Sequence, residues 1–129
     1  MLNPMVRYTG HMYKLFTVTA LAACALLAGC HSPFVSATLS NHSNAAVHVP
    51  QVEYPSASFG TTTLSAGADF HYRFKILGSG PIKITFTDAH NQDHTLSGPE
   101  LHEGQEGSLQ ITIEPDNTVD WKPSLEPRS

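Results

Sequence analysis

The strongest constraint on the fold is a strict alternation of apolar and polar residues in the middle of the chain. Apolar side chains occupy every second position of residues 70–76, and again of residues 82–87 and 109–114. Successive side chains of a β-strand point to opposite faces, so this period predicts strands with one buried and one solvated face. In the first segment the expected core side chains are Phe70, Tyr72, Phe74 and Ile76, and the expected solvent-facing ones are His71, Arg73 and Lys75.

Turn-forming residues separate these segments from further short strand candidates at residues 34–40, 45–54, 61–64, 94–96 and 118–122. No stretch after residue 30 has apolar residues at helical spacing. About seven short strands separated by turn chemistry predict an all-β domain, an antiparallel immunoglobulin-like β-sandwich over residues 34–122. We expect its core to be dominated by Phe70, Phe74, Phe86 and Trp121, and residues 123–129 to form a flexible tail.

Three details refine this prediction. Pro50 cannot donate a hydrogen bond to a neighbouring strand, so it indicates a sheet edge or a bulge. Residues 55–60 are expected to be a loop. Residues 98–107 are expected to be an acidic loop that carries Glu100, Glu103 and Glu106 in solvent.

A secretory signal precedes this domain. Leu15 to Leu27 is apolar apart from two threonines, and Lys14 comes directly before it. A basic flank, a short apolar core and small residues at the end are typical of a signal peptide. The 13 residues of this core are too few to span a bilayer, which takes roughly 20.

The signal ends in Leu27-Ala28-Gly29-Cys30, which resembles the lipobox of bacterial lipoproteins residue for residue. This resemblance implies diacylglyceryl transfer to the Cys30 thiol, cleavage between Gly29 and Cys30, and acylation of the new amino terminus. Residues 1–29 would then be a lipoprotein signal peptide, and membrane lipid would hold the protein through the acylated Cys30. The layout, a lipobox followed by one small β-rich domain, is similar to that of other small bacterial lipoproteins and implies no activity.

The flanks of the lipobox suggest further expectations. Met12 is a better-placed initiator than Met1, so residues 1–11 would be a start-site error, with Met1, Met5 and Met12 all open as starts. Residues 30–33 form a short membrane tether, because the five residues from Cys30 to the first strand reach at most about 18 Å. His31 stands where an Asp commonly signals inner-membrane retention, which favours the outer membrane, facing the periplasm.

Composition excludes several classes of partner. Removing residues 1–29 also removes Arg7 and Lys14, leaving five basic and 11 acidic residues and a formal charge of −6. An acidic domain with few basic residues is not expected to bind nucleic acid or to dock electrostatically on anionic lipid. Cys24 leaves with the signal, so a domain with an acylated Cys30 has neither a disulfide nor a free thiol and depends on its core for stability.

Histidines supply the candidate chemistry, since seven of the eight lie after Cys30. His90 and His94 flank a turn and could share a metal with Asp88 or Asp93, the low-ranking metal candidates of this chain. Their spacing matches no common zinc motif, so surface and turn roles are the preferred interpretation and no metal or other cofactor is expected.

No catalytic residues are predicted. The glutamates of residues 98–107 lie among glycines and a proline, and no serine lies in a nucleophile-elbow motif. The sequence therefore predicts a non-enzymatic, membrane-anchored envelope lipoprotein that has a binding or structural role, with an envelope protein as a possible partner. The alternative is a periplasmic metal-binding or metal-delivery lipoprotein that uses the histidine-rich turns.

Overall fold

Apolar residues at every second position bury one face of each central strand. The computed structural model describes residues 33–127, so Gly29, Cys30 and the other signal residues lie outside the described part. In the strand Gly80–Thr87, Ile82, Ile84 and Phe86 are buried, while Lys83 between them is exposed and Thr85 is partly exposed. The predicted alternation of residues 82–87 is confirmed.

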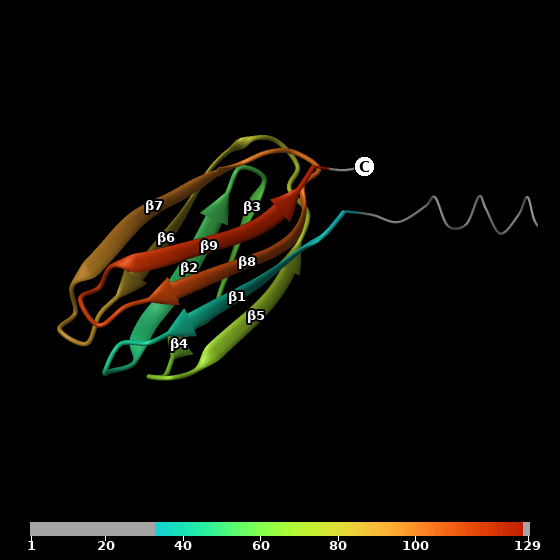
Figure 1. Ribbon diagram of the computed structural model, residues 1–129. Helices are drawn as coiled ribbons and strands as arrows, with labels where there is room; N and C mark the ends of the chain where they lie inside the picture. Colours follow the sequence, from blue (N-terminus) through green and yellow to red (C-terminus); the bar gives the residue numbers. More distant parts are fainter. Residues whose placement is uncertain (1–32, 128–129) are drawn as a thin grey trace, which may run out of the picture. The chain divides into compact units, whose positions relative to one another are not determined.

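The described residues form nine strands instead of about seven, in two stacked sheets (Figure 1). The first sheet has the order β5-β1-β8-β9, and the second has the order β3-β2-β6-β7 with β4 paired to β2. The strands are β1 (Val35–Asn41), β2 (Val47–Tyr54), β3 (Ala57–Gly60), β4 (Thr63–Leu64), β5 (Asp69–Phe74), β6 (Gly80–Thr87), β7 (Asp93–Leu101), β8 (Glu106–Ile113) and β9 (Val119–Glu126).

One pairing departs from the antiparallel arrangement that the sequence predicts. β1 and β8 run parallel side by side in the middle of the first sheet, with Val35 opposite Gly107 and Leu39 opposite Ile111. Both strands are flanked by antiparallel partners, β5 and β9. The all-β sandwich is therefore confirmed, but it is not purely antiparallel. Local turn signals could not reveal this pair, because six strands, β2 to β7, separate β1 from β8 in the sequence.

The core is mainly aliphatic. The fully buried apolar side chains come from both sheets and include Leu39, Ile76, Ile82, Ile84, Leu101, Leu109, Ile111 and Ile113. Of the four aromatic residues expected to dominate the core, Phe74 and Phe86 are buried, but Phe70 and Trp121 are only partly buried. Tyr72 was expected inside and is 41% exposed. It lies on β5, an edge strand, where its ring stacks on Phe59 of β3 with centroids 4.6 Å apart.

Two segments expected to be loops are strands. Residues 57–60 pair with β2 as β3, although Phe59 is their one large apolar residue. β7 extends to Leu101, so Glu100 lies on a strand, and Glu106 opens β8. Pairing with a central strand decides these conformations, and local composition does not reveal it.

The tail expected from residue 123 belongs to β9 as far as Glu126. Pro123 is tolerated there because β9 is an edge strand. Trp121 on β9 packs on Gly98 of β7 so closely that a Cβ at residue 98 would lie 2.6 Å from the indole. This contact brings the two sheets together along one side.

The expected irregularity at Pro50 is a bulge. The register between β2 and β6 shifts between His48 and Gln51, and Val49 has a φ of 47°. Since Pro50 has no N–H, the ladder cannot continue through it.

We call the end of the sandwich at which the chain enters β1 the proximal end. Val35, Phe74, Gly107 and Leu125 form one row across the first sheet there. The opposite, distal end carries residues 42–46, 65–68, 88–92 and 114–118, which connect strands. Among the described residues, no helix has the length and apolarity that crossing a membrane requires.

Candidate functional site

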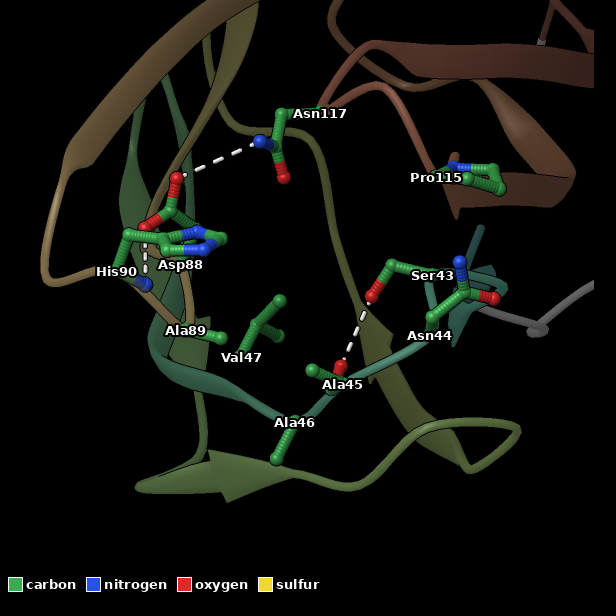
Figure 2. A pocket seen from close by; sticks show the side chains of 10 residues that line it. All are labelled: Ser43, Asn44, Ala45, Ala46, Val47, Asp88, Ala89, His90, Pro115 and Asn117. Carbon is green, nitrogen blue, oxygen red and sulfur yellow. Dashed lines mark hydrogen bonds between the residues drawn. The ribbon is translucent and has the colours of Figure 1, made fainter.

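Three connections at the distal end surround a hollow of about 180 Å³ (Figure 2). They are the β1–β2 loop, the β6–β7 turn and the β8–β9 turn. The hollow is lined by Ser43, Asn44, Ala45, Ala46, Val47, Asp88, Ala89, His90, Pro115 and Asn117. It combines small apolar surfaces with a few polar groups, as small-ligand sites do, although its volume is below the usual range of about 300–1,000 Å³.

Asn41 shapes the first wall of the hollow from beneath. Its side chain is fully buried, and its Nδ2 donates to the carbonyl oxygens of Ala45 and Leu64, each at 2.9 Å. Its Oδ1 accepts from the backbone N–H of Ser43 at 3.0 Å and from the Ser43 hydroxyl at 2.6 Å. The sequence suggests only a turn asparagine here, whereas the amide joins the β1–β2 loop to β4.

Asp88 holds the second wall. Its Oδ1 accepts the backbone N–H groups of His90 at 2.8 Å and Gln92 at 3.0 Å, which closes the tight β6–β7 turn. Its Oδ2 lies 2.8 Å from Nε2 of His94 and accepts from Nδ2 of Asn117 at 3.4 Å. Since β7 belongs to one sheet and the β8–β9 turn to the other, this buried carboxylate connects both layers.

The hydrogen bond to the His94 imidazole, assisted by the backbone N–H groups, lowers the pKa of Asp88 from 3.8 to about 2. Asp88 is therefore an anion throughout the physiological range. A carboxylate held ionised in this way accepts hydrogen bonds and stabilises the turn, and it cannot act as a general acid near neutral pH.

The β8–β9 turn forms the third wall. Oδ1 of Asp116 accepts from the hydroxyl of Thr118 at 2.5 Å and from its N–H at 3.2 Å, and these bonds lower the pKa of Asp116. Asn117 follows with a φ of 63°, a conformation that asparagine tolerates well. That backbone conformation presents its side chain to Asp88.

The structure brings only part of the predicted metal set together. Asp88 and His94 are in contact, whereas His90 reaches Asp88 through its backbone N–H. Asp93 instead accepts a hydrogen bond from the Thr87 hydroxyl at 2.6 Å. Within residues 33–127, no group of three or more histidines, cysteines or acidic residues is placed to hold a metal ion.

The side chains around the hollow are engaged by groups of the same loops and strands. The Ser43 hydroxyl lies within hydrogen-bonding distance of an amide oxygen of Asn41 and of the Ala45 carbonyl, neither of which is a base. The His94 ring also stacks on Phe86 with centroids 5.1 Å apart, which fixes its orientation. Asn44 and His90 are the exposed side chains on the rim that combine length with hydrogen-bonding capacity.

Comparisons with known proteins identify a fold and no function. No family model matches the chain, and no curated protein matches it. One similar solved structure is described as the NMR structure of the protein from Eubacterium rectale. It has a TM-score of 0.51 at 13% sequence identity, and the match covers 70% of this chain and 88% of that one. At this identity the likeness shows a shared fold alone.

Proposed function

We propose that the protein is a membrane-anchored lipoprotein of the cell envelope whose β-sandwich binds a partner without catalysis. Its binding site would be the distal hollow. The observation that carries this proposal is that three loops converge on the hollow at the end opposite the start of β1. A lipid anchor at Cys30 would attach the proximal end to the membrane and leave the distal loops facing away from it.

The lipobox Leu27-Ala28-Gly29-Cys30 supports the anchor. Mass spectrometry of the membrane fraction tests it. The expected species begins at Cys30, lacks residues 1–29 and carries acyl chains. Cys30→Ala should leave the protein unprocessed at this site, and an unmodified wild-type Cys30 would refute the anchor. We place the protein in the outer membrane, facing the periplasm, because His31 and not Asp follows the cysteine.

Photo-crosslinking in living cells tests the distal site. A photoreactive amino acid at His90 or Asn44 should capture a discrete envelope partner, because both side chains are exposed on the rim of the hollow. The matched control is the same residue at Ser124, which is exposed on β9 near the proximal end. Equal capture at Ser124 would refute a distal binding site.

Metal binding is the second candidate, and the contact between Asp88 and His94 is the observation in its favour. His90 lies in the same turn and could add a ligand if its ring rotated toward the pair. Three or four ligands at about 2.0–2.3 Å make a stable zinc site, and a pair gives weak binding. We therefore rank metal binding below partner binding. Calorimetry with Zn²⁺ and Cu²⁺ would reverse this ranking if it found a stoichiometric, submicromolar site that His90→Ala/His94→Ala removes.

For the fold, we propose an immunoglobulin-like sandwich with two extra short strands, β3 and β4, and a parallel β1–β8 pair. The two-layer arrangement and the size of the domain support this classification. We propose no nucleic-acid partner, because the acidic residues outnumber the basic ones.

A further inference from the structure

A patch of basic and apolar side chains lies at the proximal end. We define the basic patch as Phe34, Arg73, Lys75 and Leu77. The Arg73 guanidinium carbon lies 4.0 Å from the centroid of the Phe34 ring, and the Lys75 Nζ lies 5.0 Å from it. Phe34 immediately precedes β1, and Val35 pairs with Phe74 between the two cations. The patch therefore surrounds the point at which the chain enters the sandwich.

The cations of the basic patch are available to an external anion. Lys83 and Lys122 lie 3.0 and 3.4 Å from the carboxylates of Glu53 and Asp120, whereas Arg73 and Lys75 lie over an aromatic ring. A guanidinium that stacks on a ring keeps its N–H edge free, and that edge matches the oxygens of a phosphate. Both side chains are exposed.

Leu77 adds an apolar contact. Its side chain is 63% exposed, the largest exposed fraction among the exposed large apolar residues of the described chain. Its backbone is held in place, because its N–H donates to the Ser56 hydroxyl at 3.4 Å and the neighbouring Ile76 carbonyl accepts from Gly104. An exposed apolar side chain two residues after Lys75, at the same end of the sandwich, adds a contact that favours a lipid surface.

We propose that the basic patch docks on the phosphate-bearing headgroups of the membrane that carries the anchor. This proposal rests on the proposed acylation of Cys30. The five residues from Cys30 to Phe34 reach at most about 18 Å, so the patch stays within reach of the headgroups. Because the anchor holds the domain at the membrane, docking of the patch is an intramolecular step. The docked state is therefore populated even if the patch binds lipid too weakly to bring an unanchored domain to the membrane. The net charge of −6 opposes docking, but salt screens charges that lie more than about 8 Å from the surface, so the basic residues in contact with the headgroups outweigh it.

The distribution of charge predicts a tilted domain. Two acidic residues at the proximal end, Glu106 and Glu126, lie opposite each other on β8 and β9, while the basic patch lies beside β5. β8 and β9 are two and three strand spacings from β5, about 10 and 14 Å, and both distances exceed the Debye length of about 8 Å at physiological ionic strength. A third acidic residue, Glu103, lies near the Leu77 side of the patch, because its N–H donates to Ser79 and the N–H of Gly104 donates to Ile76. The β5 edge should therefore face the lipid, and the β9 edge should face away.

The test uses the full chain, purified from membranes and placed in vesicles of phosphatidylcholine with or without phosphatidylglycerol. Mass spectrometry first establishes whether Cys30 is acylated. Because no cysteine follows Cys30, a fluorophore can be placed on one introduced thiol. Leu77→Cys reports on the basic patch, Ser124→Cys on the β9 edge of the same end, and His90→Cys on the distal end. Quenching by a water-soluble quencher measures the exposure of each position.

We expect the Leu77 probe to be shielded in phosphatidylglycerol vesicles, and the Ser124 and His90 probes to remain accessible. Each basic residue near an anionic surface contributes about fivefold to binding, so Arg73→Glu/Lys75→Glu should lower the docking equilibrium constant by at least about 25-fold. High salt should have the same direction of effect. The matched control, Lys83→Glu/Lys122→Glu, changes the net charge equally but should leave the Leu77 probe shielded.

Each result has one meaning. Acylated protein with an accessible Leu77 probe overturns docking and leaves the anchor standing. An unmodified Cys30 overturns the anchor and, with it, the docking proposal. Shielding that resists both charge reversal and salt overturns headgroup binding. If the Leu77 probe is shielded in cell membranes but accessible in vesicles, the patch binds a protein partner, and this result also overturns the lipid proposal.

Discussion

Replacing Asn41 with alanine should destabilise the protein more than its place beside a surface loop suggests. The side chain is fully buried and donates to the carbonyl oxygens of Ala45 and Leu64 while accepting two hydrogen bonds from Ser43. In Asn41→Ala the Ala45 carbonyl can still accept from the Ser43 hydroxyl. The buried Leu64 carbonyl loses its amide donor and gains none.

The magnitude follows from these contacts. Asn41→Ala loses four hydrogen bonds, each worth about 1 kcal/mol, while the Leu64 carbonyl keeps its place opposite Val47 in the β2–β4 ladder. Water that enters the loop offsets part of this loss, so we expect Asn41→Ala to lower the free energy of unfolding by about 2–4 kcal/mol. Asn41→Asp should be worse at neutral pH, because it places a carboxylate against two carbonyl oxygens. Acidification should relieve that variant, since protonation of the new carboxylate restores a donor.

Urea denaturation of the variants measures these differences, with Ser43→Ala as the matched control in the same loop. Ser43→Ala leaves both Asn41 amide donors in place and should cost no more than about 1 kcal/mol. A loss of less than 0.5 kcal/mol in Asn41→Ala, roughly the range of surface substitutions, would refute the assigned role. Equal stability of Asn41→Asp and Asn41→Ala would refute the donor geometry.

Three further predictions concern the core, the distal turn and the closed side of the sandwich. Phe74→Ala should lower the free energy of unfolding by about 3–5 kcal/mol in a denaturant melt, while Arg73→Ala and Lys75→Ala should change it by no more than about 0.5 kcal/mol. The reverse ranking would contradict the assignment of Phe74 to the buried face of β5. The pKa of Asp88 is about 2 in the folded protein and 3.8 ordinarily, so the stability that its carboxylate contributes is complete above about pH 4 and is lost as the pH falls toward 2. Asp88→Asn should therefore flatten the dependence of the unfolding free energy on pH between these values. An unchanged pH dependence would contradict the assigned pKa. Gly98→Ala should cost about 1–3 kcal/mol because its Cβ displaces the Trp121 ring, and the cost should largely vanish in a Trp121→Ala background; full additivity would argue against that contact.

The sequence predicts the sandwich wherever local alternation and burial agree. β1, β6 and β8 each bury apolar side chains at every second position, among them Leu39, Ile84 and Ile111. This alternation can be read directly from the sequence. β3 escapes prediction because Phe59 alone marks it, and its conformation depends on pairing with β2. Pro123 suggests the end of a strand, yet β9 continues past it because a sheet edge tolerates the missing donor.

The candidate site is predictable only in part, for a related reason. Asp88 and His94 lie close in sequence and both belong to the predicted metal candidates, but the pattern pairs His94 with His90, whereas the structure pairs it with Asp88. Asn117 joins them from 29 positions away, and Asn41 reaches Leu64 across 23 positions. No local pattern encodes these contacts, since they exist only when the two sheets stack. Among the predicted metal candidates, Asp93 faces Thr87 because the register of β6 and β7 sets those two residues opposite each other.

The polar side chains of the distal loops mostly bind backbone groups of the protein instead of pointing into solvent. Asn41, Asp88 and Asp116 are engaged by backbone N–H groups or carbonyls of their own loops, and Asn41 also by the Leu64 carbonyl of β4, so each fixes a wall of the hollow and has little capacity left for a ligand. Walls fixed before binding lose little conformational entropy on binding, which favours affinity from a small contact area. If the proposed binding site is correct, the groups left to recognise a partner are the exposed rim side chains of Asn44 and His90, together with the small apolar side chains of Ala45, Ala46 and Ala89. An amide and an imidazole over small apolar surfaces would suit a polar, uncharged group of a neighbouring protein better than an anion, because the ionised Asp88 repels negative charge.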